Sequence, residues 1–419
     1  MKKKVYIGLI AWLVATCLYA QQNANYDESK VPAYTLPELL LTNNGEKISG
    51  KRQWEKQRRP ELLELFASQM FGRTPEGNID VAYEIVAENL NAMNGKATSK
   101  QVKFIFSNGK KKNEALLLMY IPNKPKGKVP VFIGYNFQGN HTTTFDITVL
   151  YSPVLHLVYE PGHPDWKRGT QTSMWSYDEI IDRGYAIATM CYHDIYPDKP
   201  EFRDQSIVSL FPEYDPGHIV PGEWQSIGAW AWGLSRIVDF METQKEIDCK
   251  KIALMGHSRQ GKAALWAGAQ DERFRIVISD NSGCGGAALF RRKFGETAAV
   301  INDRFPHWFC KNFHQYNNRE EELTVDQHQL IALIAPRKVY VASAEEDLWA
   351  DPRGEFLAAY HAGPVYRLYG LTAIDTDEMP ELHKPIMGDI GYHIRAGVHG
   401  VTEYDWERYL DFADKHFKK

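Results

Sequence analysis

Short apolar runs separated by polar loops recur through the middle of the chain. Residues 129–135, 185–191 and 252–255 carry no charge at all, and 274–279 and 338–343 carry one charge each. Runs of this kind are typical of strands buried on both faces of a parallel sheet. Longer segments with apolar residues at helical spacing, such as 227–241 and 404–417, lie between or after these runs. The alternation predicts an α/β fold with a mostly parallel central sheet.

The N-terminal part of the chain has a different pattern. Residues 54–71 predict a helix that ends at Gly72, with one apolar face formed by Leu62, Leu63, Leu65, Phe66 and Met70. Residues 79–87 and 101–106 alternate between apolar and polar positions, and 114–120 is the next predicted strand. This alternation is typical of antiparallel strands, so we expect such strands on the N-terminal side of the sheet.

The first 20 residues predict a secretory signal peptide. A basic start at Lys2–Lys4 precedes an apolar stretch from Tyr6 to Leu18, which is too short to span a bilayer, and Ala20 ends it with a small residue. We expect cleavage after Ala20, a secreted or periplasmic protein, and one catalytic domain over residues 21–419. A lipoprotein anchored at Cys17 is the alternative, although Thr16 before that cysteine is a poor match.

Composition narrows the possible partners. The 419 residues carry a net charge of −4 with no basic block, and no later segment is long and apolar enough for a membrane span. We therefore expect no nucleic acid or membrane partner, and a monomer. The sequence has no H-E-x-x-H or C-x-x-C motif, which argues against a zinc site. Four cysteines, too few to be the main stabilising links, remain after the signal peptide: Cys191, Cys249, Cys284 and Cys310.

The segment Gly256–Gly261 (GHSRQG) matches the G-x-S-x-G elbow of serine hydrolases. An apolar strand precedes it and good helix formers follow it, which is the strand–turn–helix context that the motif requires. We predict that Ser258 is the nucleophile, exposed on a tight turn. The backbone N–H of Arg259, at the start of the helix, would then face the oxyanion that forms during attack.

A nucleophilic serine needs a histidine and a carboxylate, which follow it along the chain in this class of fold. His399 lies in the glycine-flanked segment Gly397–Gly400 before the last helix, and His393 is the second candidate. Carboxylates crowd after the strand at 338–343, and spacing does not choose among Glu345, Glu346, Asp347 and Asp351. A second possible acid position is 280–282.

Six segments together resemble the bacterial glucuronoyl esterases of carbohydrate esterase family 15. They are 256–262 (GHSRQGK), 281–287 (NSGCGGA), 294–297 (FGET), 305–309 (FPHWF), 326–337 (DQHQLIALIAPR) and 346–352 (EDLWADP). The resemblance implies an α/β-hydrolase fold, that is, a three-layer sandwich. It also implies cleavage of esters between the 4-O-methyl-glucuronic acid of glucuronoxylan and lignin alcohols, without metal or cofactor. The expected activity is that of a 4-O-methyl-glucuronoyl methylesterase.

The resemblance also assigns roles to individual residues. It implies Ser258 as nucleophile, His399 as base and Arg259 as an aid to the oxyanion hole. Lys262, Glu296 and Trp349 match positions that hold the sugar.

Two positions depart from the fungal members of this family. Asn281 stands where fungal members keep a glutamate, which favours Asp347 as the acid, as in many bacterial members. The fungal disulfide is also missing, because this chain has His257 and Gly400 at the two cysteine positions.

Two other functions fit the same elbow. One is a carbohydrate esterase of another specificity, acting on acetyl-xylan or simple esters. The other is a non-catalytic carbohydrate-binding relative, which an intact Ser258, Asp347 and His399 argue against.

Overall fold

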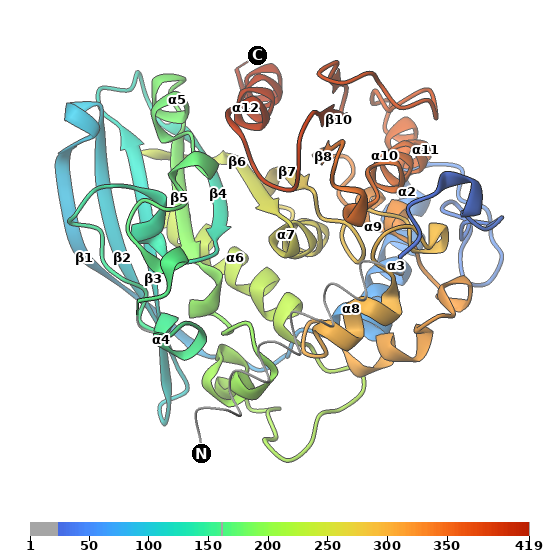
Figure 1. Ribbon diagram of the computed structural model, residues 1–419, viewed down its shortest axis with the longest axis horizontal. Coiled ribbons are helices and arrows are strands. Elements are labelled where there is room, and N and C mark those ends of the chain that lie inside the picture. The colour runs from blue at the N-terminus through green and yellow to red at the C-terminus, as the bar shows by residue number, and fades with distance from the viewer. Residues whose placement is uncertain (1–23, 161, 419) are drawn as a thin grey trace.

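A ten-stranded mixed sheet runs through the molecule (Figure 1). The computed structural model describes residues 24–160 and 162–418, so the predicted signal peptide and Cys17 lie outside the described residues. In chain order the strands are β1 (Asp80–Ala92), β2 (Ala97–Ser107), β3 (Lys112–Pro122), β4 (Val129–Asn136), β5 (Ala186–Cys191), β6 (Ile247–His257), β7 (Phe274–Asp280), β8 (Lys338–Ala344), β9 (Ile386–Met387) and β10 (Ile390–Arg395).

The strand order across the sheet is β1-β2-β3-β5-β4-β6-β7-β8-β10-β9. The six neighbouring strands from β5 to β10 pair in parallel, whereas β1, β2 and β3 add an antiparallel extension at one edge. The prediction of a mostly parallel sheet with antiparallel strands on the N-terminal side is therefore confirmed. The sequence did not predict the last two strands, β10 and the short antiparallel β9 at the opposite edge.

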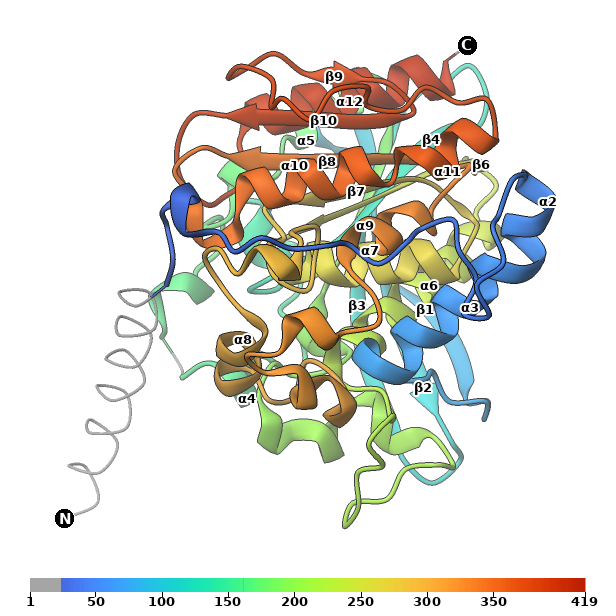
Figure 2. The same cartoon turned by 90° about the vertical axis from the view of Figure 1, so that its right-hand side faces the viewer.

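Helices cover both faces of the sheet. They are α2 (Lys51–Gln53), α3 (Arg59–Phe66), α4 (Leu155–Val158), α5 (Tyr177–Asp182), α6 (Ser226–Thr243), α7 (Arg259–Gln270), α8 (Ala298–Arg304), α9 (Gln327–Ala332), α10 (Pro352–His361), α11 (Gly363–Leu368) and α12 (Glu403–Phe417). α5 and α12 lie on one face, and α6 and α7 lie on the other (Figures 1 and 2). None of the helices in the described ranges is long and apolar enough to cross a bilayer.

Two hydrophobic cores fill the spaces between these layers. On β4, Val131 and Ile133 point into the core under α6 and α7, whereas Phe132 points into the core under α5 and α12. Successive side chains of a strand face opposite sides of the sheet, so a strand buried on both sides needs apolar residues at every position. This explains why the uncharged runs in the sequence became the central strands.

The predicted helix at 54–71 is present as one continuous helical segment. It combines α2 and α3 with π-helical turns at Trp54–Arg58 and Ala67–Phe71, and it ends at Gly72, whose φ is +82°. A side chain at Gly72 would overlap the backbone of Trp224. Glycine is therefore needed here both for the positive φ of the turn and for the close packing against Trp224.

The turn between β6 and α7 requires glycine at position 256. A Cβ atom at Gly256 would overlap the carbonyl oxygen of Gln260 in the first turn of α7. Because the Gln260 oxygen belongs to the backbone, it cannot move aside without opening the turn.

Gly256→Ala should therefore lower the free energy of unfolding by about 2 kcal/mol and reduce the activity expected from the serine elbow together with it. Urea titration followed by circular dichroism measures the first effect. Gly217→Ala is the matched control, because its Cβ would meet only the Asp215 carboxylate at 3.5 Å. A Gly256→Ala protein as stable as the control would contradict this account of the turn.

Candidate active site

The carboxyl ends of the parallel strands place the predicted catalytic residues at one edge of the sheet. Ser258 directly follows β6, Asp347 lies in the loop after β8, and His399 lies in the loop between β10 and α12. Because neighbouring parallel strands end at the same edge, residues up to 141 positions apart in the chain become neighbours.

Ser258 sits on a strained turn. Its φ is +57° and its ψ is −129°, a conformation that L-residues rarely adopt. The turn is held by the Ser258 N–H, which donates to the Asp280 carbonyl at the end of β7 at 2.8 Å. Gly261 allows α7 to approach this strand, because a side chain there would press against Ser282. The serine therefore stands at the N-terminus of α7, whose first backbone N–H groups have no partner inside the helix.

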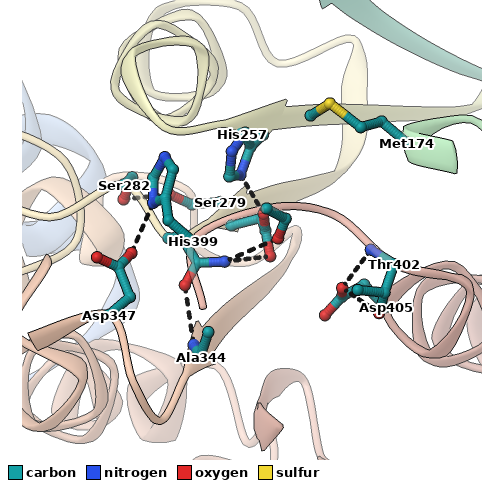
Figure 3. A network of polar contacts seen from close by, with 12 residues as sticks. Met174, His257, Ser279, Ser282, Ala344, Asp347, His399, Thr402 and Asp405 are labelled. Atoms are coloured by element: carbon teal, nitrogen blue, oxygen red, sulfur yellow. Dashed lines mark hydrogen bonds and ion pairs between the residues drawn. The ribbon is translucent and has the colours of Figure 1, made fainter. Parts of the chain in front are cut away.

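His399 forms a hydrogen bond with Asp347, its Nδ1 lying 2.6 Å from Oδ2 (Figure 3). The Asp347 side chain is 5% exposed and that of His399 is 45% exposed. A buried carboxylate thus orients a ring that remains open to solvent and substrate. With Nδ1 on the aspartate, Nε2 is the nitrogen left to exchange protons.

The structure separates Asp347 from the other carboxylates of its loop. Glu345 and Glu346 are exposed. Asp351 is buried, but it caps α10 through the Gly354 N–H and forms an ion pair with Arg292 at 2.8 Å.

His393, the second candidate base, lies inside β10 and is fully buried. Its Nε2 bonds to Asp405 at 2.8 Å and its Nδ1 to the Tyr340 hydroxyl at 3.0 Å. Both nitrogens are therefore occupied within the core.

Asn281, at the second possible acid position, is a structural connector. Its side-chain oxygen accepts from the Ala344 N–H at 2.8 Å, and its amide group donates to Asp280 and to the Gly400 carbonyl, each at 3.2 Å. Asn281 thus joins the ends of β7 and β8 to the His399 loop. A glutamate could not donate to either acceptor, so the neutral amide fits this position.

A pocket of about 280 Å³ opens beside Ser258. It is lined by Ser258, Arg259, Lys262, Asn281, Ser282, Gly283, Glu296, Arg304, Phe305, Trp308, Asp347, Trp349, Ala350 and His399. All seven site residues expected from the sequence are among them, drawn from four separate segments. Their convergence makes this pocket the candidate active site.

Arg259 is held in place by a buried aspartate that the sequence did not point to. The guanidinium forms a short ion pair with Asp198, which also accepts from His307 Nε2 at 2.8 Å and Trp308 Nε1 at 2.7 Å. Burial alone would raise the pKa of Asp198, but Arg259 and His307 hold that pKa well below its usual range. Asp198 is therefore a fixed anion that fastens Arg259 at the pocket.

The Arg259 guanidinium also packs against aromatic rings. It lies 5.2 Å from the centre of Phe305 and 4.8 Å from that of Trp308, and these two rings stack at 3.8 Å. Cation–π contact adds to the ion pair and restricts the guanidinium further.

The far side of the pocket is lined by opposite charges with little access to water. Lys262 and Glu296 are both buried, and burial lowers the pKa of Lys262 and raises that of Glu296. Each group partly offsets the shift of the other. Arg304 lies 3.8 Å from Glu296 and 5.3 Å from the centre of the Trp349 ring. The pocket thus offers fixed donors and acceptors beside two indole rings, Trp308 and Trp349.

Several of these residues escaped the sequence analysis. Asp198 and Arg304 carry no motif of their own. The only signal for Asp198 is its place in the polar loop after β5, at the edge of the sheet where ligands gather. Trp308 stands in one of the segments that resemble the family, but no role was predicted for it.

No disulfide was found among the described residues: Cys191, Cys249, Cys284 and Cys310 are all free. His257 instead bonds to Asp280, Nδ1 to Oδ2, at 2.5 Å, and its ring lies 4.5 Å from that of His399 (Figure 3). Burial raises the pKa of Asp280 to about 8, with a further contribution from Asp405. Burial, together with His399, holds the pKa of His257 well below its usual range.

A serine elbow at the carboxyl end of a mostly parallel sheet, with helices on both faces, is the arrangement of the α/β-hydrolase class. Known proteins identify the family. A family model described as "Glucuronyl esterase, fungi" matches residues 222–370. Carbohydrate esterase MZ0003, from an unknown prokaryotic organism, is 44% identical over 412 residues, which cover 97% of this chain and 95% of the relative.

Solved structures agree with this result. A promiscuous CE15 esterase from a marine bacterial metagenome has a TM-score of 0.86 and 43% identity, covering 94% of this chain and 100% of that one. A glucuronoyl esterase from Solibacter usitatus has a TM-score of 0.85 and 42% identity, covering 93% and 100%. The chain belongs to the glucuronoyl esterases of carbohydrate esterase family 15.

The His399–Asp347 hydrogen bond suggests a direct test of whether Asp347 is the carboxylate that orients the base. Asp347→Asn should lower kcat on the order of 10³-fold to 10⁴-fold with little change in KM, because an amide cannot stabilise the imidazolium formed during attack. Glu346→Gln, one position away and exposed, is the matched control and should leave kcat within about twofold of the wild type. Steady-state kinetics on one glucuronate ester decides between them, and a larger fall for Glu346→Gln would overturn the assignment.

Proposed function

We propose that this protein is a secreted or periplasmic serine esterase that cleaves esters of 4-O-methyl-glucuronic acid, such as those joining glucuronoxylan to lignin alcohols. The observation that carries the proposal is the common opening of the serine elbow and the His399–Asp347 pair into one small polar pocket. The signal-like start of the chain supports export. No additional macromolecular partner is proposed.

In the first half of the proposed reaction, Ser258 Oγ attacks the uronate carbonyl carbon while His399 Nε2 takes the hydroxyl proton. Asp347, bonded to Nδ1, stabilises the resulting imidazolium. The carbonyl oxygen becomes an oxyanion beside the N-terminus of α7, where the Arg259 N–H and its permanently charged guanidinium favour the negative charge.

Collapse of this intermediate breaks the bond to the alcohol oxygen, which takes the proton from His399. The glucuronoyl group then remains on Ser258 as an ester. A water molecule, deprotonated by His399, attacks that ester. Protonation of Ser258 releases glucuronate and restores the free enzyme.

The pocket explains why a uronate would be the acyl group. Its volume and its mixture of buried charges and indole rings suit one sugar ring with several hydroxyl groups. We assign Lys262 and Glu296 to the sugar hydroxyls and Trp349 to the ring face. The alcohol would leave on the side of His399, whose neighbours Val398 and Leu348 are exposed apolar residues.

A broader ester specificity is the second candidate. One relative, 43% identical to this chain, is described as a promiscuous CE15 esterase. The same elbow would serve acetyl-xylan or simple esters, so kcat/KM for benzyl glucuronate and for acetylated xylan must be measured side by side. A kcat/KM that favours the acetyl ester would replace the proposed substrate class.

Ser258→Ala should lower benzyl glucuronate hydrolysis by roughly 10⁴-fold or more, because the remaining groups bind and polarise the ester without a nucleophile. The variant should retain the wild-type circular dichroism spectrum and thermal midpoint. Ser282→Ala provides a control at a second serine that lines the same pocket. Unchanged turnover by Ser258→Ala would end the proposal.

A further inference from the structure

The loop that carries His399 must hold this residue in a fixed position, and the family assignment does not explain how. Residues 396–400 carry His399 between two flexible glycines, Gly397 and Gly400, both with positive φ. Val398 is 64% exposed and the His399 side chain is 45% exposed. Side-chain packing therefore holds this loop only weakly. A base must nevertheless stay within a fraction of an ångström of its working position.

Arg395, at the end of β10, lies inside the curve of this loop. Its Nη1 donates to the Ala396 carbonyl at 3.0 Å, and its Nη2 donates to the Val398 carbonyl at 3.2 Å and to the Gly400 carbonyl. The carbonyls on both sides of His399 are thus bound to one planar group. Arg395 is 3% exposed, so water does not compete for these bonds.

Asp405 fixes the guanidinium from the other side. Arg395 Nε donates to both Asp405 oxygens, at 3.1 and 2.8 Å. The same carboxylate accepts from His393 Nε2. It also accepts from the Thr402 N–H and from the Thr402 hydroxyl (Figure 3). Asp405 is fully buried in the first turn of α12, so the pair closes the loop at both of its ends.

We propose that Arg395, anchored by Asp405, is the positioning residue that holds His399 against Asp347. The inference rests on the proposed role of His399 as the base. Arg395 does not touch the reacting atoms; it acts by restricting the loop that carries the imidazole. This chain has no cysteines at the fungal disulfide positions, and the hydrogen bonds from Arg395 to three carbonyls of one loop supply the restraint instead.

The geometry requires arginine rather than a positive charge alone. A lysine at 395 could keep an ion pair with Asp405, but its three donors radiate from one nitrogen and cannot also reach three carbonyls in a plane. Arg395→Lys therefore keeps the positive charge but removes the planar group of donors. This variant tests which of the two properties holds the loop.

In the full-length protein, Arg395→Lys should lower kcat for benzyl glucuronate on the order of a hundredfold and leave KM within about twofold. KM should stay nearly unchanged because Arg259 and Lys262 lie on α7 and Trp349 lies in the loop after β8. The downfield proton signal of His399 Nδ1–H, shared with Asp347, should broaden or disappear. Arg183→Met is the matched control: it removes ion pairs to Asp411 and Asp414 on the same helix without touching the His399 loop.

Two results would overturn the proposal: a folded Arg395→Lys protein with wild-type kcat, or one with lowered kcat but an unchanged Nδ1 proton signal. If the variant fails to fold, a measurement on the wild-type protein still tests the proposal. Backbone order parameters of residues 398–400 should lie near ~0.85, as in rigid structure, and values below ~0.6 would contradict the restraint. The NMR readouts need no substrate, so an inactive wild type would refute the proposed substrate and not the positioning role.

Discussion

The hydrogen bond between His399 and Asp347 is the interaction on which the rest of the site depends. It joins the loop after β8 to the loop after β10. Two backbone hydrogen bonds link the same segments: Glu345 N–H donates to the Arg395 carbonyl at 2.8 Å, and Glu346 N–H donates to the Gly397 carbonyl at 3.0 Å. The parallel pairing of β8 with β10 sets the distance between them. A buried carboxylate and an open imidazole are thereby fixed without a covalent link.

Three of the charged side chains close to the pocket have a partner of opposite charge. Asp198 neutralises Arg259, Glu296 faces Lys262, and Asp405 holds Arg395. An unpaired ion at such depth would cost several kcal/mol. Pairing lets the protein keep cations beside Ser258 and in the proposed sugar pocket while the surrounding aromatic rings exclude water. Rigid pairs of this kind also need no rearrangement when charge develops on the substrate.

Much of this arrangement could be predicted from the sequence, and the missing parts have physical reasons. The central strands were visible because burial on both faces demands uninterrupted apolar residues. β10 was not, because Gly391, His393 and Arg395 break that pattern: a side chain at 391 would strike Tyr340, and the other two are buried only because Asp405 satisfies them. Local spacing left four acids open after β8. The hydrogen bond to His399 singled out Asp347, and that bond depends on a contact between segments that are distant in sequence.

The central claim is that Ser258 is a nucleophile activated inside a uronate pocket. Stoichiometric labelling with a fluorophosphonate, followed by peptide mass spectrometry, tests it most directly, because the reagent reacts only with an activated serine. We predict a single adduct per chain, on Ser258, which forms more slowly when glucuronate occupies the pocket. An unlabelled protein, or an adduct on another serine with Ser258 unmodified, would contradict the account.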